Sequence, residues 1–116
     1  MVHVITDDTF QAEVVDSDVP CIVEFTAGWC TMCDAMAPTL EELSDRYAGK
    51  VKFCIANIDE NKALRIRFAV AAIPYIVLVN DGMQTPLFDE LVTAERLSER
   101  IDFVLAGNPA PTTRPL

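Results

Sequence analysis

The sequence predicts an α/β fold in which a five-stranded mixed sheet is flanked by four helices. Short runs rich in Val, Ile and Phe alternate with longer segments whose apolar residues recur every three or four positions. This alternation is typical of a mainly parallel sheet with helices on both faces. NDG at 80–82 is a hairpin signal that adds an antiparallel strand, and the length of 116 residues fits a single domain.

Residues 1–50 contain two predicted strands and two predicted helices. Residues 2–6 are expected to form a short strand, followed by a helix with Phe10 and Val14 on one face. CIVEFT at 21–26 is an apolar strand that one carboxylate interrupts. This strand leads through AGWC into a long helix, and Pro38 is expected to kink that helix because proline removes a backbone hydrogen bond.

Residues 51–106 supply three more strands and two helices. YIVLV at 75–79 is a continuous apolar run, which is typical of a strand buried on both faces. The strand expected at 84–89 contains Pro86, and proline fits there only if the strand lies at the edge of the sheet. The remaining elements are a strand over 51–58 and helices over 60–69 and 93–106.

Residues 1–106 form the predicted domain, and residues 107–116 form a tail. The tail, GNPAPTTRPL, contains three prolines and shows no apolar periodicity. Such a segment has little surface to bury in a core, so we expect it to be flexible.

Composition limits the partners of the protein. Eighteen acidic and nine basic residues give a net charge of −9, which should repel nucleic acid and anionic membranes. MVHVITDDTF lacks the basic start and apolar run of a signal peptide, and no stretch is apolar enough to span a membrane. We therefore expect a cytoplasmic protein in which cysteines outside a redox site stay reduced.

The two cysteines of WCTMC at 29–33 are the candidates for chemistry. Cys30 falls where a strand ends and the long helix begins, and the free N–H groups of a helix start carry a partial positive charge. A thiolate is stabilised there, so we expect Cys30 to be the attacking nucleophile. Cys33 lies one turn deeper, close enough to resolve a mixed disulfide. The spacing predicts thiol–disulfide exchange.

Two alternatives to redox chemistry are a zinc site and an inert cysteine pair. Structural zinc needs four ligands, and only Cys21 and Cys54 remain, both in predicted strands and without paired spacing. These two cysteines are expected to be small buried hydrophobes, so no metal is expected. An inert pair is less favoured, since a pair directly after a strand at a helix start is the redox arrangement.

VEFTAGWCTMC, ANIDEN and AIPY together resemble the thioredoxin family, and the likeness runs from about residue 3 to 106. The resemblance implies a thioredoxin fold. It also implies that the bond between Ile73 and Pro74 is cis and faces the two cysteines, where main-chain groups can pair with an extended substrate.

Two departures from the family, at three residues in all, could change the redox potential. Thr31 and Met32 stand where the family usually has Gly-Pro, which restores a backbone N–H near Cys30 and should make the potential less negative. Asp34 stands where a basic residue is usual, and its charge opposes a neighbouring thiolate. The two effects oppose each other. The alternative is that Asp34 is a solvated acid that stabilises the first turn of the helix through the helix dipole.

Glu24 occupies the position of the family's buried aspartate, which is thought to relay protons for the resolving cysteine. A carboxylate among apolar residues loses hydration, so we expect a raised pKa and proton exchange with Cys33. Ile55 replaces the lysine that accompanies this carboxylate in the family, which should raise the pKa further. An exposed Glu24 with no such role is the alternative.

The resemblance also implies an apolar groove for protein substrates around the cysteines. Tyr75 and Glu90 replace the threonine and glycine usual in the family; Glu90 should narrow the substrate range, while Tyr75 could serve packing alone. The expected substrate-binding residues are Trp29, Thr31, Met32, Ile73, Pro74, Tyr75, Glu90 and Leu91.

The sequence therefore predicts a monomeric protein thiol–disulfide oxidoreductase that acts on protein disulfides without a cofactor. Because no nucleotide-binding glycine fingerprint is present, electrons are expected from an external enzyme that resembles thioredoxin reductase. One alternative is an adaptor or chaperone with a thioredoxin fold that binds partner polypeptides with little redox turnover. Another is an oxidase or isomerase of disulfides, if the potential is high.

Overall fold

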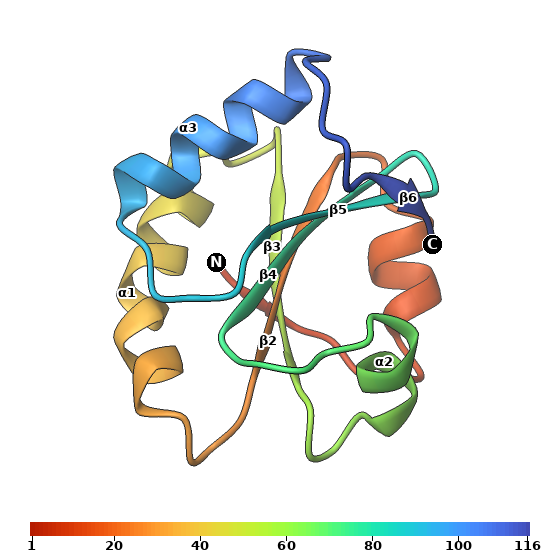
Figure 1. Ribbon diagram of the computed structural model, residues 1–116, viewed down its shortest axis with the longest axis vertical. Helices are drawn as coiled ribbons and strands as arrows, with labels where there is room; N and C mark the ends of the chain where they lie inside the picture. Colours follow the sequence, from red (N-terminus) through yellow and green to blue (C-terminus); the bar gives the residue numbers. More distant parts are fainter.

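The computed structural model describes residues 1–116 as one mixed sheet with helices on both faces (Figure 1). Every predicted strand and helix is present with somewhat different ends, and the sheet has six strands rather than five. None of the helices has the length and apolar character needed to cross a membrane. The strands are β1 (His3–Val4), β2 (Cys21–Thr26), β3 (Lys52–Asn57), β4 (Tyr75–Asn80), β5 (Met83–Phe88) and β6 (Arg114–Pro115). The helices are the π-helix η1 (Gln11–Val15) and the α-helices α1 (Thr31–Arg46), α2 (Lys62–Arg67) and α3 (Ala94–Leu105).

The strand order is β1-β3-β2-β4-β5-β6, with β2 near the centre of the sheet. β1, β3 and β2 are parallel, but β4 runs antiparallel to β2, so the expectation of a mainly parallel sheet was wrong for β4. The reason is the length of α2. A helix of six residues is about 9 Å long, whereas a strand of six residues is about 20 Å long. α2 therefore cannot return the chain to the other end of the sheet, and β4 starts where β3 ends (Figure 1).

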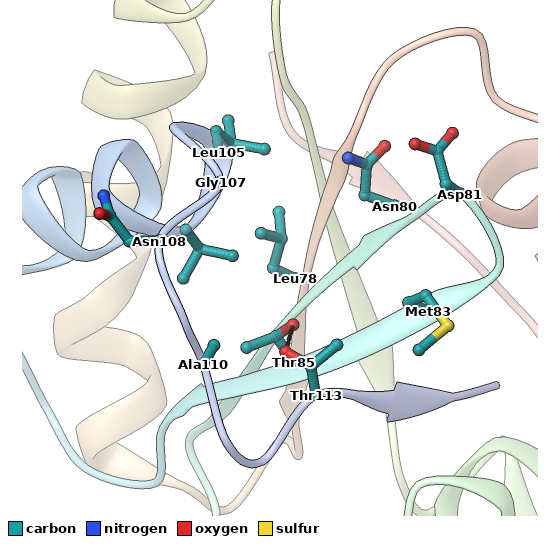
Figure 2. A pocket seen from close by; sticks show the side chains of 11 residues that line it. Leu78, Asn80, Asp81, Met83, Thr85, Leu105, Gly107, Asn108, Ala110 and Thr113 are labelled. Atoms are coloured by element: carbon teal, nitrogen blue, oxygen red, sulfur yellow. Dashed lines mark hydrogen bonds between the residues drawn. The ribbon is translucent and has the colours of Figure 1, made fainter.

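The sixth strand comes from the segment predicted to be a tail. β6 pairs with Met83 and Gln84 of β5, and the hydroxyl groups of Thr85 and Thr113 lie 2.7 Å apart in a hydrogen bond (Figure 2). The tail also borders a cavity of about 440 Å³ beside the β4–β5 hairpin. Pro86 lies beyond the positions that β6 pairs, so it occupies an open edge of the sheet, as predicted.

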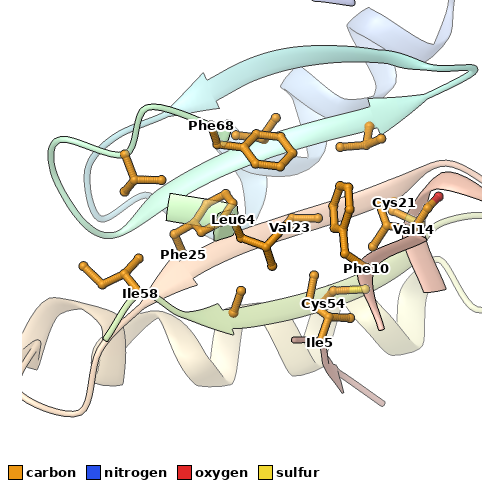
Figure 3. Packing of buried hydrophobic residues seen from close by; sticks show 14 of the residues in the cluster. Ile5, Phe10, Val14, Cys21, Val23, Phe25, Cys54, Ile58, Leu64 and Phe68 are labelled. Atoms are coloured by element: carbon orange, nitrogen blue, oxygen red, sulfur yellow. The ribbon is translucent and has the colours of Figure 1, made fainter. Parts of the chain in front are cut away.

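One face of the sheet is covered by η1 and α2. Phe68 of α2's C-terminal end lies at the centre of this layer, with its ring 5.6 Å from that of Phe10 and 5.1 Å from that of Phe25 (Figure 3). Cys30 and Cys33 belong to the same buried cluster. The candidate redox pair is therefore anchored in the core.

The other face is covered by α1 and α3. Met36, Leu40 and Leu43 of α1 pack in one cluster with Leu97 and Ile101 of α3. α1 continues through Pro38 to Arg46. Because residues 21–25 of β2 are buried between the two layers, the end of β2 and the start of α1 have well-defined positions.

Candidate active site

The two cysteines lie at the junction of β2 and α1. Ala27 and Gly28 turn the chain out of the sheet, and the backbone N–H of Cys30 donates a 3.1 Å hydrogen bond to the carbonyl of Ala27. Cys30 then caps α1, which begins at Thr31. The small residues that follow the apolar strand allow this turn. The Cys30 side chain can then accept a hydrogen bond from a backbone N–H in the first turn of the helix.

Cys30 and Cys33 form a disulfide, with their Cα atoms 5.2 Å apart. The backbone N–H of Cys33 donates a 3.1 Å hydrogen bond to Sγ of Cys30. After reduction, this donor and the positive end of α1 would stabilise a thiolate at Cys30. Cys30 as a whole is 6% exposed, so its side chain is largely covered by the surrounding chain.

Glu24 lies on β2 and is only 2% exposed, which confirms its predicted burial. Its oxygen Oε2 has no hydrogen-bond partner. The neighbouring strands place Ile55 and Ile76 beside it, so no basic side chain offsets its charge from these strands. Burial raises the pKa of Glu24 to about 8. This carboxyl can therefore gain and lose a proton near neutral pH.

Glu24 and Cys33 line the same cavity, which has a volume of about 190 Å³. Ala37 and Leu40 of α1 form another part of its wall, and Ile55 faces it from β3. The buried carboxyl of Glu24 and the Cys33 side chain therefore border one shared space.

Trp29 is 67% exposed beside Cys30. Its indole Nε1–H donates a 2.8 Å hydrogen bond to Oδ2 of Asp59, and the backbone N–H of Asp59 donates a 2.8 Å hydrogen bond to Oδ1 of Asn57. Sequence reasoning did not assign a role to Asp59. Asp59 lies within ANIDEN, just after the strand that precedes α2, but this motif does not indicate a contact with a residue 30 positions earlier.

The segment before β4 contributes the predicted cis bond, which joins Ile73 and Pro74. Ile73 packs against the cluster that contains both cysteines, and Pro74 is buried. The Tyr75 ring stacks on Phe25, with 6.0 Å between ring centres. Tyr75 therefore contributes to packing.

The remaining predicted groove residues are exposed. Thr31 and Met32 lie on the first turn of α1, where Met32 is 51% exposed. Glu90 and Leu91 follow β5, and the pairing of Phe88 with Ile76 puts this connection at the end of the sheet where β4 begins. Glu90 forms a 3.7 Å ion pair with Arg96.

The two other cysteines are buried and free, as predicted. Cys21 and Cys54 lie in the cluster beneath η1 (Figure 3). A hydrogen bond with Cys21, together with burial, raises the pKa of Cys54, which keeps its thiol neutral. The side chains of Cys30 and Cys33 are bonded to each other, and no three His, Cys, Asp or Glu residues of the chain form a group that could hold a metal ion.

A cysteine that caps a helix at the end of a central strand, joined to a second cysteine one turn deeper, defines a protein thiol–disulfide oxidoreductase. The chain belongs to the thioredoxin family, since the family model described as Thioredoxin matches residues 1–103. It is 43% identical to thioredoxin C-2 of Corynebacterium nephridii over 77 residues, which cover 66% of this chain and 71% of that protein. It is 35% identical to thioredoxin 1 of Nostoc sp. over 98 residues, or 84% of this chain and 92% of that protein. A thioredoxin of Haemophilus influenzae is 42% identical over 78 residues, which cover 67% and 73% of the two chains.

Proposed function

We propose that this oxidoreductase works as a reductase of protein disulfides, with Cys30 as nucleophile, Cys33 as resolving thiol and Glu24 as proton relay. The observation that carries the proposal is the hydrogen bond from the Cys33 N–H to Sγ of Cys30 at the start of α1. This arrangement favours an ionised sulfur at the position that meets the substrate.

In the first step the Cys30 thiolate attacks one sulfur of the substrate disulfide. The substrate S–S bond breaks, one substrate sulfur leaves with the electron pair, and a mixed disulfide joins Cys30 to the other sulfur. The exposed side chains of Trp29 and Met32 and the segment at Ile73 and Pro74 would bind the substrate chain, with Thr31, Tyr75, Glu90 and Leu91 at the margins. A groove of this kind can pair with an extended polypeptide through main-chain groups.

In the second step Cys33 passes its proton to the Glu24 carboxylate and attacks Sγ of Cys30. The Cys30–Cys33 bond forms, the mixed disulfide breaks, and the second substrate sulfur leaves as a thiolate. Glu24 can accept this proton only in its ionised form. Because burial raises the pKa of Glu24 to about 8, this step should accelerate as the pH rises towards and past that value.

The reduced enzyme would be regenerated by an external donor that resembles thioredoxin reductase. We place this cycle in the cytoplasm, where it would carry electrons to protein disulfides and support redox homeostasis. The two buried free thiols of Cys21 and Cys54 support a reducing compartment. We expect the protein to act as a monomer.

The test is to trap the mixed disulfide with a Cys33→Ser variant. With no resolving thiol, the variant should stay covalently joined to reducible proteins, and mass spectrometry of the captured species should find the bond at Cys30. A Cys30→Ser/Cys33→Ser variant is the matched control. Equal capture by both variants would contradict a nucleophilic Cys30.

The dipeptide between the cysteines should set the redox potential. We expect the wild type to have a less negative potential than a Thr31→Gly/Met32→Pro variant, by about 30 mV or more, which corresponds to about 1.4 kcal/mol. The physical reason is the extra backbone N–H near Cys30 in the wild type. A glutathione redox titration of both proteins measures the difference. Asp34 is present in both proteins, so the effect of its charge cancels from the difference in potential. A wild-type potential that is equal to that of the variant, or more negative, would disprove the effect of the dipeptide.

A further inference from the structure

The cavity beside Glu24 contains a second group of acids, which the proposed relay does not use. Asp34 and Glu41 of α1 line the cavity together with Glu24 and Cys33. Asp34 and Glu41 are exposed, whereas the Glu24 oxygen Oε2 is buried and without a partner. The other side of the cavity wall has no ionisable side chain besides Glu24, since it is formed by Val2, Thr26 and Ile55. The route between Glu24 and solvent therefore runs past carboxylates and no base.

Glu24 must release a proton before it can receive one from Cys33. Its pKa of about 8 means that most molecules carry a proton on this carboxyl at neutral pH. That proton has to reach solvent through the cavity, because the apolar neighbours Ile55 and Ile76 block transfer within the sheet. A cavity of about 190 Å³ with several polar groups on its wall has room for water molecules, each of which takes about 30 Å³.

Of the two exposed acids, Asp34 lies nearer to Cys33, the thiol whose proton Glu24 has to accept. Asp34 follows Cys33 directly in the first turn of α1, whereas Glu41 lies seven residues further along, or about 10 Å at 1.5 Å per residue. The first turn is also where the cavity meets the reacting sulfur, since Cys33 and Asp34 both line it.

We infer that Asp34 is the proton-exchange residue of this enzyme, which carries protons between Glu24 and solvent through the shared cavity. The inference rests on the proposed relay role of Glu24. In each oxidation of the dithiol, Glu24 first loses its proton to the cavity and Asp34 passes it to solvent. Cys33 then transfers its own proton to the ionised Glu24 and attacks Cys30, and the substrate sulfur leaves with the electron pair of the broken bond.

The charge of Asp34 alone would have the opposite effect. A carboxylate near Cys33 and Glu24 disfavours their ionised forms, so removing its charge should speed resolution if the residue acted only through electrostatics. If Asp34 exchanges protons, removing it should slow resolution. The direction of the change therefore separates the two roles.

The experiment mixes the reduced protein with excess Ellman's reagent in dilute buffer near neutral pH and follows thionitrobenzoate release by stopped flow. The first release reports attack by Cys30 and depends on reagent concentration; the second reports resolution by Cys33 and does not. We expect Asp34→Asn to slow the second phase about tenfold, less than the loss of a direct general base. Asp34→Glu should restore most of the rate, and added imidazole should rescue Asp34→Asn in proportion to its concentration.

Glu41→Gln is the matched control, since it removes the other exposed carboxylate of the same cavity with the same change in charge. We expect it to change the second phase less than twofold, within the range typical of a solvated charge. A faster or unchanged second phase in Asp34→Asn, or a slow phase that neither imidazole nor Asp34→Glu restores, overturns the inference.

Glu24→Gln separates failure of this inference from failure of the proposed relay. If Glu24 is the relay, the second phase of the Glu24→Gln variant should be slow, and added imidazole should not accelerate it. If Glu24→Gln resolves as fast as the wild type, the relay itself is wrong, and the role of Asp34 falls with it. If Glu24→Gln is slow but Asp34→Asn is not, only the role of Asp34 is refuted.

Discussion

Replacement of Cys30 by serine is expected to lower the rate of insulin disulfide reduction by more than about a thousandfold, to the rate of dithiothreitol alone. Sγ of Cys30 caps α1, because it accepts a hydrogen bond from the backbone N–H of Cys33. A serine hydroxyl can accept the same hydrogen bond, but it is not ionised near neutral pH and cannot form a disulfide. Precipitation of the insulin B chain, followed by turbidity with dithiothreitol as electron source, measures the rate.

Two further variants identify the role of each cysteine. Cys33→Ser should retain one rapid attack per molecule and lose repeated turnover, since the mixed disulfide can no longer be resolved. Cys21→Ala should keep the wild-type rate, because Cys21 is buried beneath η1 and takes no part in the disulfide. Insulin reduction that is no faster for the wild type than for Cys30→Ser would contradict catalysis and favour the adaptor that binds partner polypeptides.

The redox pair could be predicted from the sequence because its position depends on local features. The apolar run at 21–26 predicts a buried strand, and the helical periodicity after residue 30 predicts where α1 begins. A cysteine at that boundary must lie near free helix N–H groups, whatever the rest of the chain does. The burial of Glu24 followed in the same way from its apolar neighbours on β2.

Other features depend on contacts between distant segments, which local patterns do not contain. β4 runs antiparallel because it pairs with β2, a strand from an early part of the chain, and the short α2 leaves β4 at the end of the sheet where this pairing starts. β6 lies in a proline-rich segment, and it is held by Thr113 and by the backbone N–H of Leu116, which donates a 3.0 Å hydrogen bond to the carbonyl of Gly82. Composition alone gave no reason to place this segment on β5.

The candidate site was incomplete for the same reason. The bond from Trp29 to Asp59 joins two loops that lie side by side only because β2 and β3 are neighbouring parallel strands. Asp34 was recognised as unusual for its charge near Cys33, but its shared cavity with Glu24 arises from the packing of α1 on the sheet. The position of Cys30 at a helix start is a local feature, whereas the shared cavity of Glu24 and Asp34 depends on tertiary packing.

Replacement of Glu24 by glutamine is expected to change the pH dependence of stability. In the folded wild type, burial raises the pKa of Glu24 from 4.5 to about 8, whereas the unfolded chain ionises this group near 4.5. Between these values the folded state holds a proton that the unfolded state has released. The free energy of unfolding of the wild type should therefore fall as the pH rises from about 4.5, and this loss should end above about pH 8.

Glutamine has nearly the same shape as glutamate and does not titrate, so the free energy of unfolding of the variant should not show this fall with pH. From pH 4.5 to pH 7 its free energy of unfolding should rise relative to the wild type by about 3 kcal/mol, since each pH unit contributes about 1.4 kcal/mol. Urea unfolding of both oxidised proteins at several pH values measures the difference between their free energies of unfolding. The contributions of the other acids are the same in both proteins and cancel from this difference. Glu41→Gln, an exposed acid on the same cavity, should show no such trend. A constant difference for Glu24→Gln would mean that Glu24 has the same pKa in the folded and the unfolded chain, and the carboxyl would then be ionised near neutral pH and could not act as a proton relay there.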